Sequence, residues 1–263
     1  MIPAWQLALS FAIALSIGVG VAIAVEELRW MRRRGRLTRA AVREMWLSLS
    51  SLPPNVGVSI VLAGVWVGIF EAARNLTPLR IETGMLTLIP ALLLADFCYY
   101  LEHRCAHRWR ALWMLYHAVH HSSPDYTVAT AYRVSFVNQL IAPLFYLPCV
   151  LAGFEPLLVV ALQVFAIHYQ AWVHARAIGE LPPLDAVFNT PANHRMHHDA
   201  DSSARGVNFG GVFVIWDRLF GTYSAPRTVR AFGIAGSEAP RNWRELYTAP
   251  FTAARVTRPP TIR

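Results

Sequence analysis

The chain has 263 residues, of which 55% are hydrophobic and 15% are charged. Soluble domains usually contain roughly 45–50% apolar and about 25% charged residues, so this composition excludes an ordinary soluble domain. The formal net charge is +8, but so apolar a chain is not a nucleic-acid binder, and its arginines are typical of loops beside anionic lipid.

The first element is an apolar segment over residues 3–25, which is long enough to cross a membrane because about 20 residues suffice. It lacks a basic start and a clear cleavage site, which favours a membrane anchor over a signal peptide. Arginines follow at once, and they are Arg29, Arg32, Arg33, Arg34, Arg36, Arg39 and Arg43. This density of arginine predicts a cytoplasmic loop, so we expect the N-terminus to face outside.

Two further spans are predicted before the first histidines. The second covers about residues 46–70, and Pro53-Pro54 is expected to kink it or delay its start. The third covers about residues 84–101 and contains Asp96, whose depth in the membrane makes it a functional candidate. Asp96 lies seven residues before His103 and therefore on the same helix face, although a carboxylate satisfied by a neighbour is the simpler alternative.

The chain contains 10 histidines, and most of them lie in sets with helical spacing. His103 and His107 are four residues apart, at the cytoplasmic end of the third span. Two later sets have the spacing i, i+3 and i+4, which places the members of each set on one helix face. These sets are His117, His120 and His121, and then His194, His197 and His198; the remaining histidines are His168 and His174.

The second histidine set lies in a polar segment, and the chain then returns to the membrane. Residues 108–135 are polar and aromatic and predict a cytoplasmic helix and turn, in which Tyr126, Tyr132 and Arg133 either line the site or pack at the interface. Residues 136–173 are apolar and are interrupted by prolines and Gly153. They predict two antiparallel helices, either a full hairpin or a shallower re-entrant pair, that carry His174 to the side of the other histidines.

Residues 175–225 are predicted to be cytoplasmic. Metal-bound histidines usually donate their outer N–H to a carboxylate or a carbonyl, so Asp199, Asp201 and Asp217 are candidates to support ligand imidazoles, together with Asp96. Gln170 shares a helix face with His174 and joins them. Residues 226–263 are expected to form a tail that covers the cytoplasmic face or lies on the membrane.

The histidine count points to two metal ions. Imidazole binds zinc, copper, iron and nickel, and eight or nine imidazoles are too many for one zinc, which takes four ligands. The three cysteines, Cys98, Cys105 and Cys149, are odd in number and lie in or beside apolar segments, so no disulfide framework is indicated. Cys105 points away from the face of His103 and is not expected to be a ligand.

The motifs around the histidines resemble the fatty acid hydroxylase and sterol desaturase superfamily of integral-membrane di-iron oxygenases. The resemblance covers roughly residues 90–225 and includes the connecting runs at 96–107, 120–126, 189–194, 208–211 and 216–223, which look most like the alkylglycerol monooxygenase branch. It implies that the ligands are His103, His107, His117, His120, His121, His174, His194, His197 and His198, whereas His168 does not match. In one departure, Leu101 and Glu102 precede the first histidine, where the family often has aromatic residues.

The predicted fold is all-α: a helical bundle in the membrane with a cytoplasmic helical cap that carries a histidine-rich di-metal site. We expect N-terminal membrane helices and a basic cytoplasmic loop over residues 1–80, a fatty acid hydroxylase-like catalytic domain over 81–225, and a cytoplasmic tail over 226–263. The expected location is the bacterial inner membrane, with the active site on the cytoplasmic side.

The resemblance implies an oxygenase that uses two iron ions and dioxygen to hydroxylate a C–H bond of a lipid, such as an alkylglycerol ether, a fatty acyl lipid or a sterol-like lipid. No G-x-G-x-x-G fingerprint or haem-attachment motif is present, so we expect an external electron donor, either a reduced pterin or a redox protein. A lipid desaturase, a zinc-dependent membrane hydrolase with Glu102 or Asp199 as base, and a non-catalytic metal-binding membrane protein stay open.

Overall fold

The computed structural model describes residues 3–200 and 206–252, and within these ranges it is helical, with two isolated β-bridges and no sheet. Four helical segments are long and apolar enough to cross a membrane. They are α1 (Ala4–Arg33), α2 with α3 (Arg39–Leu49 and Leu52–Arg74), α4 (Met85–Arg108) and α9 (Pro156–Val173). The prediction of an all-α membrane bundle is confirmed.

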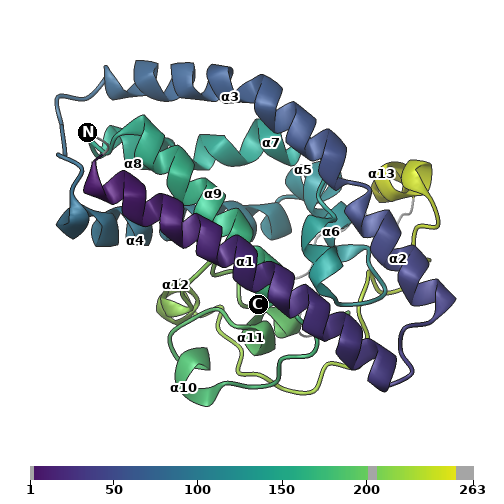
Figure 1. Ribbon diagram of the computed structural model, residues 1–263. Helices are drawn as coiled ribbons and strands as arrows, with labels where there is room; N and C mark the ends of the chain where they lie inside the picture. The colour runs from purple at the N-terminus through teal and green to yellow at the C-terminus, as the bar shows by residue number, and fades with distance from the viewer. Residues whose placement is uncertain (1–2, 201–205, 253–263) are drawn as a thin grey trace.

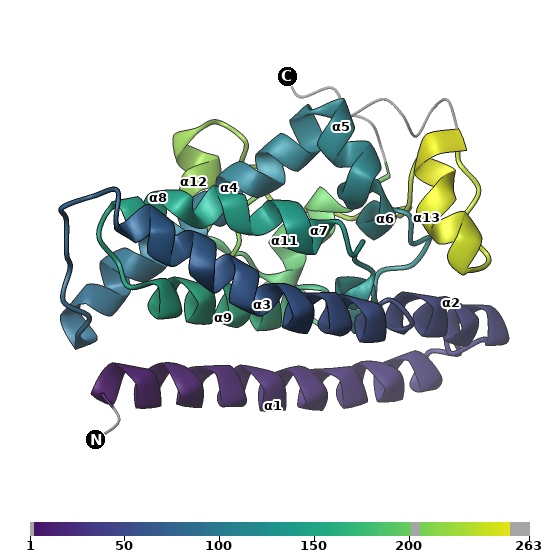
Figure 2. The same cartoon turned by 90° about the horizontal axis from the view of Figure 1, so that it is seen from above.

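The long helices lie side by side and leave an apolar outer surface. α1 packs along α9, and α3 packs against α9 as well (Figures 1 and 2). Phe11 on α1 is 70% exposed, and Ile60 and Val61 on α3 are 71% and 77% exposed. Exposed apolar side chains at this density suit a lipid environment, because water would disfavour so large an apolar surface.

The second predicted span is divided at its prolines. Trp46 belongs to α2, whose start is capped by the Thr38 hydroxyl, which accepts a hydrogen bond from the Ala41 N–H at 3.1 Å. Pro53 and Pro54 stand in the first turn of α3, where a missing N–H leaves no helical bond unmade. The chain therefore starts a new helix at Leu52 within this span, which is the delayed start that the sequence offered as one alternative.

The predicted antiparallel pair is present over residues 138–173. Its first arm consists of α7 (Asn138–Ile141), η3 (Ala142–Tyr146) and α8 (Leu147–Leu151), and this arm is shorter than the segments that could cross a membrane. The chain turns at Gly153, whose φ of +104° suits glycine, and an added Cβ would lie 3.0 Å from the Leu79 backbone. α9 then returns toward the histidines.

The histidine-bearing end is built from short helices. They are α5 (Arg110–Leu112), η1 (Trp113–His117, a π-helical turn), α6 (Ala118–His121), η2 (Val128–Tyr132), α10 (Pro182–Asp185), α11 (Pro191–His197), α12 (Ile215–Leu219) and α13 (Trp243–Thr252). α13 packs against α6 and η1. The described part of the predicted tail therefore covers this end, while the domain boundaries at residues 80 and 225 stay predictions.

The basic end of α1 lies at the same end of the molecule as the histidines. Glu27 on α1 is only 1% exposed and accepts hydrogen bonds from the Val128 N–H at 2.7 Å and the Arg176 N–H at 2.6 Å. Since a buried carboxylate needs such partners, these bonds hold α1 against the loops beside the second histidine set and His174. The arginine-rich segment and the histidines therefore share one side of the bundle.

Candidate metal centre

Nine of the histidines converge into two groups. The five-histidine group contains His103, His107, His117, His121 and His197, and the four-histidine group contains His120, His174, His194 and His198. Within each group, the ring nitrogens that could bind a metal lie within 4.8 Å of one another. These are the nine histidines predicted from the sequence. His168 belongs to neither group, and its Nδ1 faces the Val164 carbonyl oxygen at 2.7 Å.

Each i, i+3, i+4 set is divided between the two groups. His117 and His121 enter the five-histidine group, while His120 between them enters the other. The last set divides in the same manner, with His197 separated from its two neighbours. At 3.6 residues per turn, positions i and i+4 differ by about 40°, whereas i+3 and i+4 differ by about 100°. The spacing therefore serves two adjacent sites, a division that our single-face interpretation did not predict.

Backbone carbonyls set the proton positions in the five-histidine group. The Nδ1 of His103 lies 3.0 Å from the Phe209 carbonyl oxygen, and the Nδ1 of His197 lies 2.9 Å from that of Val207. A carbonyl oxygen can only accept, so each Nδ1 carries the proton and each Nε2 presents a lone pair. The rings are thereby oriented with their free nitrogens toward the centre of the group.

These free nitrogens are spaced as ligands of one ion would be. The Nε2 of His117 lies 3.1 Å from those of His103 and His121, and the Nε2 of His197 lies 3.0 Å from that of His121. Lone pairs so close together repel unless a cation lies between them. With metal–nitrogen bonds of about 2.1 Å, ligands at right angles are about 3.0 Å apart and tetrahedral ligands about 3.4 Å. The spacing fits a metal with more than four ligands.

The four-histidine group is oriented in the same way by other backbone carbonyls. The Nδ1 of His174 lies 2.6 Å from the Gln170 carbonyl oxygen, and the Nδ1 of His120 lies 3.3 Å from that of Arg133. The Nε2 of His174 lies 3.2 Å from the Nε2 of each of the other three histidines in the group, which are His120, His194 and His198. This group also fits a metal ion.

Burial keeps these imidazoles neutral, which is the form that binds metal. It lowers the pKa of His117, His121 and His198 well below the usual value, and the neighbouring imidazoles lower it further. Burial also lowers the pKa of His120 to about 4. At neutral pH the groups therefore present uncharged nitrogens rather than a repelling cluster of cations.

Asp217 supports the five-histidine group through the backbone. Its carboxylate accepts hydrogen bonds from the Phe209 and Gly210 N–H groups, both at 2.8 Å, and from the Thr222 hydroxyl at 2.7 Å. Phe209 in turn supplies the carbonyl that orients His103. Asp217 is fully buried, which raises its pKa to about 6, and the hydrogen bonds that it accepts hold this loop against the histidines.

Asp96 holds the next part of the same loop. It accepts hydrogen bonds from the Val212 N–H at 2.6 Å, the Phe213 N–H at 3.2 Å and the Trp216 indole N–H at 3.0 Å. Gly211 is required here, because an added Cβ would lie 2.6 Å from an Asp96 oxygen. Asp96 is thus satisfied by the loop and positions it against α4.

The other predicted supporting residues take different places. The backbone carbonyl oxygen of Gln170 orients His174. The side-chain amide N–H of Gln170 donates to the Gly211 backbone carbonyl at 3.2 Å. Asp199 lies 3.5 Å from the Arg227 guanidinium. Asp201 lies outside the described residues.

Tyr126 and Arg133 pack beside the site. The ring of Tyr126 stacks on that of His174, with centroids 5.4 Å apart, and its hydroxyl donates to the Val173 carbonyl at 2.6 Å. Arg133 is buried, as is the Tyr126 ring, whereas Tyr132 is half-buried. The question left open by the sequence is thereby answered for Tyr126, which contacts a histidine of the four-histidine group.

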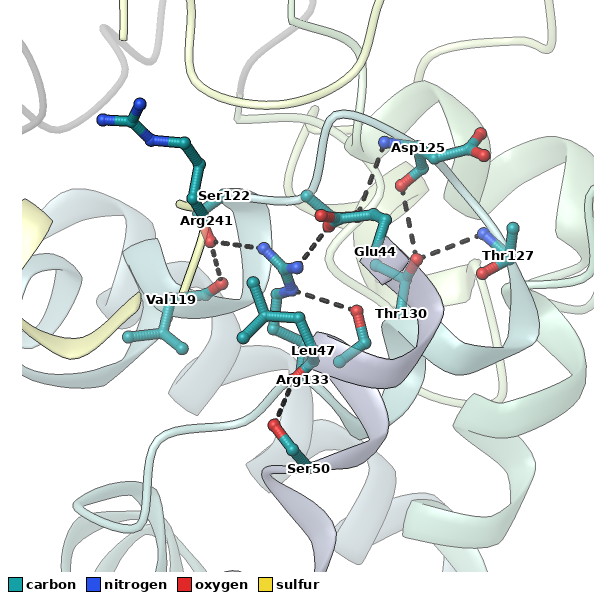
Figure 3. A network of polar contacts seen from close by, with 12 residues as sticks. Glu44, Leu47, Ser50, Val119, Ser122, Asp125, Thr127, Thr130, Arg133 and Arg241 are labelled. Carbon is teal, nitrogen blue, oxygen red and sulfur yellow. Dashed lines mark hydrogen bonds and ion pairs between the residues drawn. The ribbon is translucent and has the colours of Figure 1, made fainter. Parts of the chain in front are cut away.

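A buried network joins α2 to the four-histidine group. The Arg133 guanidinium donates to the Ser122 hydroxyl at 3.0 Å and the Ser48 hydroxyl at 3.1 Å, and it pairs with Glu44 (Figure 3). Since the Arg133 carbonyl also orients His120, this network fixes one histidine of that group. Neither Glu44 nor Ser48 was predicted from the sequence, because no local pattern connects α2 to Arg133, which lies far away in the chain.

Both groups open onto one cavity of about 120 Å³. Its walls combine histidines from both groups with apolar and polar side chains. They are Tyr99, Glu102, His103, Tyr116, His117, His120, Ala131, Val134, Asn138, Ile167, Gln170 and His174. Exposed Ile167 on α9 belongs to this wall, so the cavity adjoins the apolar surface of the bundle.

The fatty acid hydroxylase family model matches residues 88–222, which is more than half of the chain and includes all nine converging histidines. The chain belongs to this family. The resemblance noted in the sequence is thereby confirmed.

Several curated relatives are similar to about half of the chain. The chain is 40% identical over 149 residues to alkylglycerol monooxygenase of Homo sapiens, a match that covers 56% of the chain and 33% of that protein. It is 31% identical over 140 residues to ornithine lipid hydroxylase OlsE of Rhizobium tropici, covering 53% of the chain and 42% of the relative. It is 32% identical over 139 residues to Delta(7)-sterol 5(6)-desaturase ERG3A of Gibberella zeae, covering 51% and 37%.

The chain therefore spans less than half the length of these relatives. No solved structure matches it.

Proposed function

We propose that the protein is a membrane-bound di-iron oxygenase that hydroxylates a C–H bond of a lipid, with the nine converging histidines as metal ligands. The observation that carries this proposal is the shared cavity, onto which both buried histidine groups open beside the apolar surface. The names of the relatives, which include a monooxygenase, a hydroxylase and a desaturase of lipids, support the same chemistry.

Iron is the metal we propose for both groups. Five close nitrogens exceed the four ligands of zinc, and the nitrogen spacing favours a higher coordination number. When bound, the two irons would supply reductive activation of dioxygen and oxidation of an unactivated C–H bond. His103 and His117 would hold one ion at the cavity wall, while His120 and His174 would hold the other.

The chain itself would bind and orient the lipid. Ala131, Val134 and Ile167 supply apolar wall, against which an alkyl chain can bury its methylene groups. The small volume leaves room for only part of a lipid, so the remainder of the alkyl chain would stay in the bilayer. Burial of the histidines also limits the entry of water to the site.

The substrate that we favour is an alkylglycerol ether, with fatty acyl and sterol-like lipids as alternatives. The alkylglycerol monooxygenase relatives support this order. Electrons would come from an external donor, for which a reduced pterin is the first candidate and a redox protein the second.

We further propose that the histidine-bearing end faces the cytoplasm. The arginine-rich end of α1 lies at this end, and arginine is enriched in cytoplasmic loops. Reporter fusions after Arg43 and after Tyr223 should both report a cytoplasmic location, and an external signal from either would reject this topology. The matched relatives come from animals, a fungus and a bacterium, so the bacterial inner membrane stays a prediction.

The decisive experiment uses iron-loaded protein in lipid nanodiscs with a reduced pterin or a ferredoxin-type donor. We expect oxygen consumption only when a lipid such as hexadecylglycerol is present, with label from ¹⁸O₂ in the hydroxylated product or in its breakdown products. A carbon–carbon double bond without label would favour the desaturase. Turnover without oxygen, or with zinc in place of iron, would favour the hydrolase, and metal binding without turnover would favour a binding protein.

A further inference from the structure

The cavity wall carries a carboxyl–phenol pair that neither histidine group uses. The Tyr116 hydroxyl donates to Glu102 Oε1 at 2.6 Å, and the two residues are 2% and 7% exposed. Glu102 directly precedes His103, and Tyr116 directly precedes His117. Both of these histidines belong to the five-histidine group, and their Nε2 atoms are 3.1 Å apart. The pair therefore lies on the cavity wall beside that group.

This part of the wall can accept more hydrogen bonds than the protein supplies. A carboxyl group offers lone pairs on two oxygens, and Tyr116 donates to only one of them. Gln170 also lines the cavity, and its Oε1 is buried and has no hydrogen-bond partner among the described residues. Buried acceptors without a donor are uncommon and cost free energy. The unpartnered Gln170 oxygen, together with the remaining lone pairs of Glu102 on the same wall, points to a ligand that brings hydrogen-bond donors.

We propose that Glu102 selects the substrate by accepting a hydrogen bond from the polar end of the lipid. This inference rests on the proposed lipid-hydroxylase function and adds the residue that would recognise the polar end. The donor is a hydroxyl or an ammonium group, which share this chemistry. No arginine is among the residues that line the cavity, so the wall itself offers an anionic lipid end no cationic partner.

The test compares three lipids that share a hexadecyl chain: hexadecylglycerol, its dimethyl ether and hexadecylamine. Binding of each radiolabelled lipid to iron-loaded protein in nanodiscs is measured for wild type, Glu102→Gln and the control Glu71→Gln, which changes an exposed glutamate on α3. Wild type should bind hexadecylglycerol about tenfold more tightly than the dimethyl ether. Glu102→Gln should reduce this preference to about twofold or less with iron content unchanged, while Glu71→Gln should keep it.

The outcomes separate the two donors. If hexadecylamine is the lipid whose affinity depends on Glu102, the donor is an ammonium group, and if it is hexadecylglycerol, the donor is a hydroxyl. An undiminished preference in Glu102→Gln overturns the inference. If wild type binds and hydroxylates lipids without any dependence on Glu102, the inference fails alone, whereas absence of lipid binding removes the proposed function with it.

A second measurement requires no folded variant. A hexadecyl lipid with a photoactivatable diazirine beside its terminal hydroxyl is irradiated with the wild-type protein, and the modified peptide is identified by mass spectrometry. Modification of Glu102 or Tyr116 supports the inference, and modification confined to residues outside the cavity overturns it.

Discussion

The two histidine groups use similar chemistry but depend on different parts of the fold. In the five-histidine group, His103 and His107 come from the membrane helix α4, and the loop that orients His103 is held by Asp217. The four-histidine group takes no ligand candidate from a membrane-spanning helix, because His174 lies directly after α9. Its outer support is the Arg133 network, which reaches α2.

This difference indicates that the groups can be weakened separately. Because the two supports share no residue, a change in one should leave the other largely intact. The group with fewer histidines also leaves more positions around a metal free for other ligands. The five-histidine group should therefore hold its metal more firmly, and the four-histidine group should respond more to changes at the membrane surface.

The largest effect is expected from removing one histidine in either group. His107→Ala should remove the metal of the five-histidine group, and His194→Ala that of the four-histidine group, with activity lost in both. Metal analysis of the purified proteins should find about one ion fewer per chain in each variant, since each group is proposed to hold one ion. His168→Ala is the control and should keep both ions, whereas loss of both ions from a single variant would show that the groups form one cooperative site.

The next largest effect is expected from Arg133→Met. This change leaves Glu44 without its buried partner, and breaking such a pair typically costs about 3–5 kcal/mol. Thermal unfolding should show the loss of stability, and metal binding should weaken first in the four-histidine group, because the Arg133 segment orients His120. Arg29→Met, which removes an exposed ion pair, should change little. Equal weakening of both groups would contradict the separation proposed here.

A smaller loss of metal binding, in the five-histidine group instead of the four-histidine group, is expected from Asp217→Asn. The amide keeps the size of the side chain but cannot accept all of the hydrogen bonds that hold Phe209 and Gly210. Loss of an outer partner of a metal ligand typically lowers metal affinity roughly 10–100-fold. Competition titration with a chelator should find this loss in the five-histidine group, with the four-histidine group as the internal control.

The smallest effect concerns pH. Burial lowers the pKa of His120 from its usual 6.5 to about 4, so the unfolded chain binds more protons than the folded protein between these values. The stability contributed by the neutral imidazole is present above pH 6.5 and is lost as the pH falls through this window. Thermal unfolding of the metal-free protein should follow this course, and His120→Ala should reduce the slope. An unchanged slope would show that His120 is not buried in the metal-free protein.

Local sequence patterns were enough to predict the class of fold and the set of histidines that converge. Long apolar segments, helical spacing of the histidines and the position of the arginines are local patterns, and each reports on one helix at a time. They were sufficient to predict the membrane bundle, which is confirmed, whereas the two-metal site and the exclusion of His168 as a ligand stay predictions. They also placed His174 with the other histidines, because the turn at Gly153 reverses the chain.

Which histidines converge in each group, and which residues hold them there, depends on tertiary packing. The spacing within α6 sets the angle between the rings of His120 and His121, but which other histidines each ring meets depends on where α9 and α11 lie around α6. The partners Arg133 and Glu44 are 89 residues apart, so their pairing arises from packing. The backbone carbonyls of Phe209 and Val207 orient His103 and His197. Every residue has a backbone carbonyl, so the sequence could not indicate which of them would face a histidine.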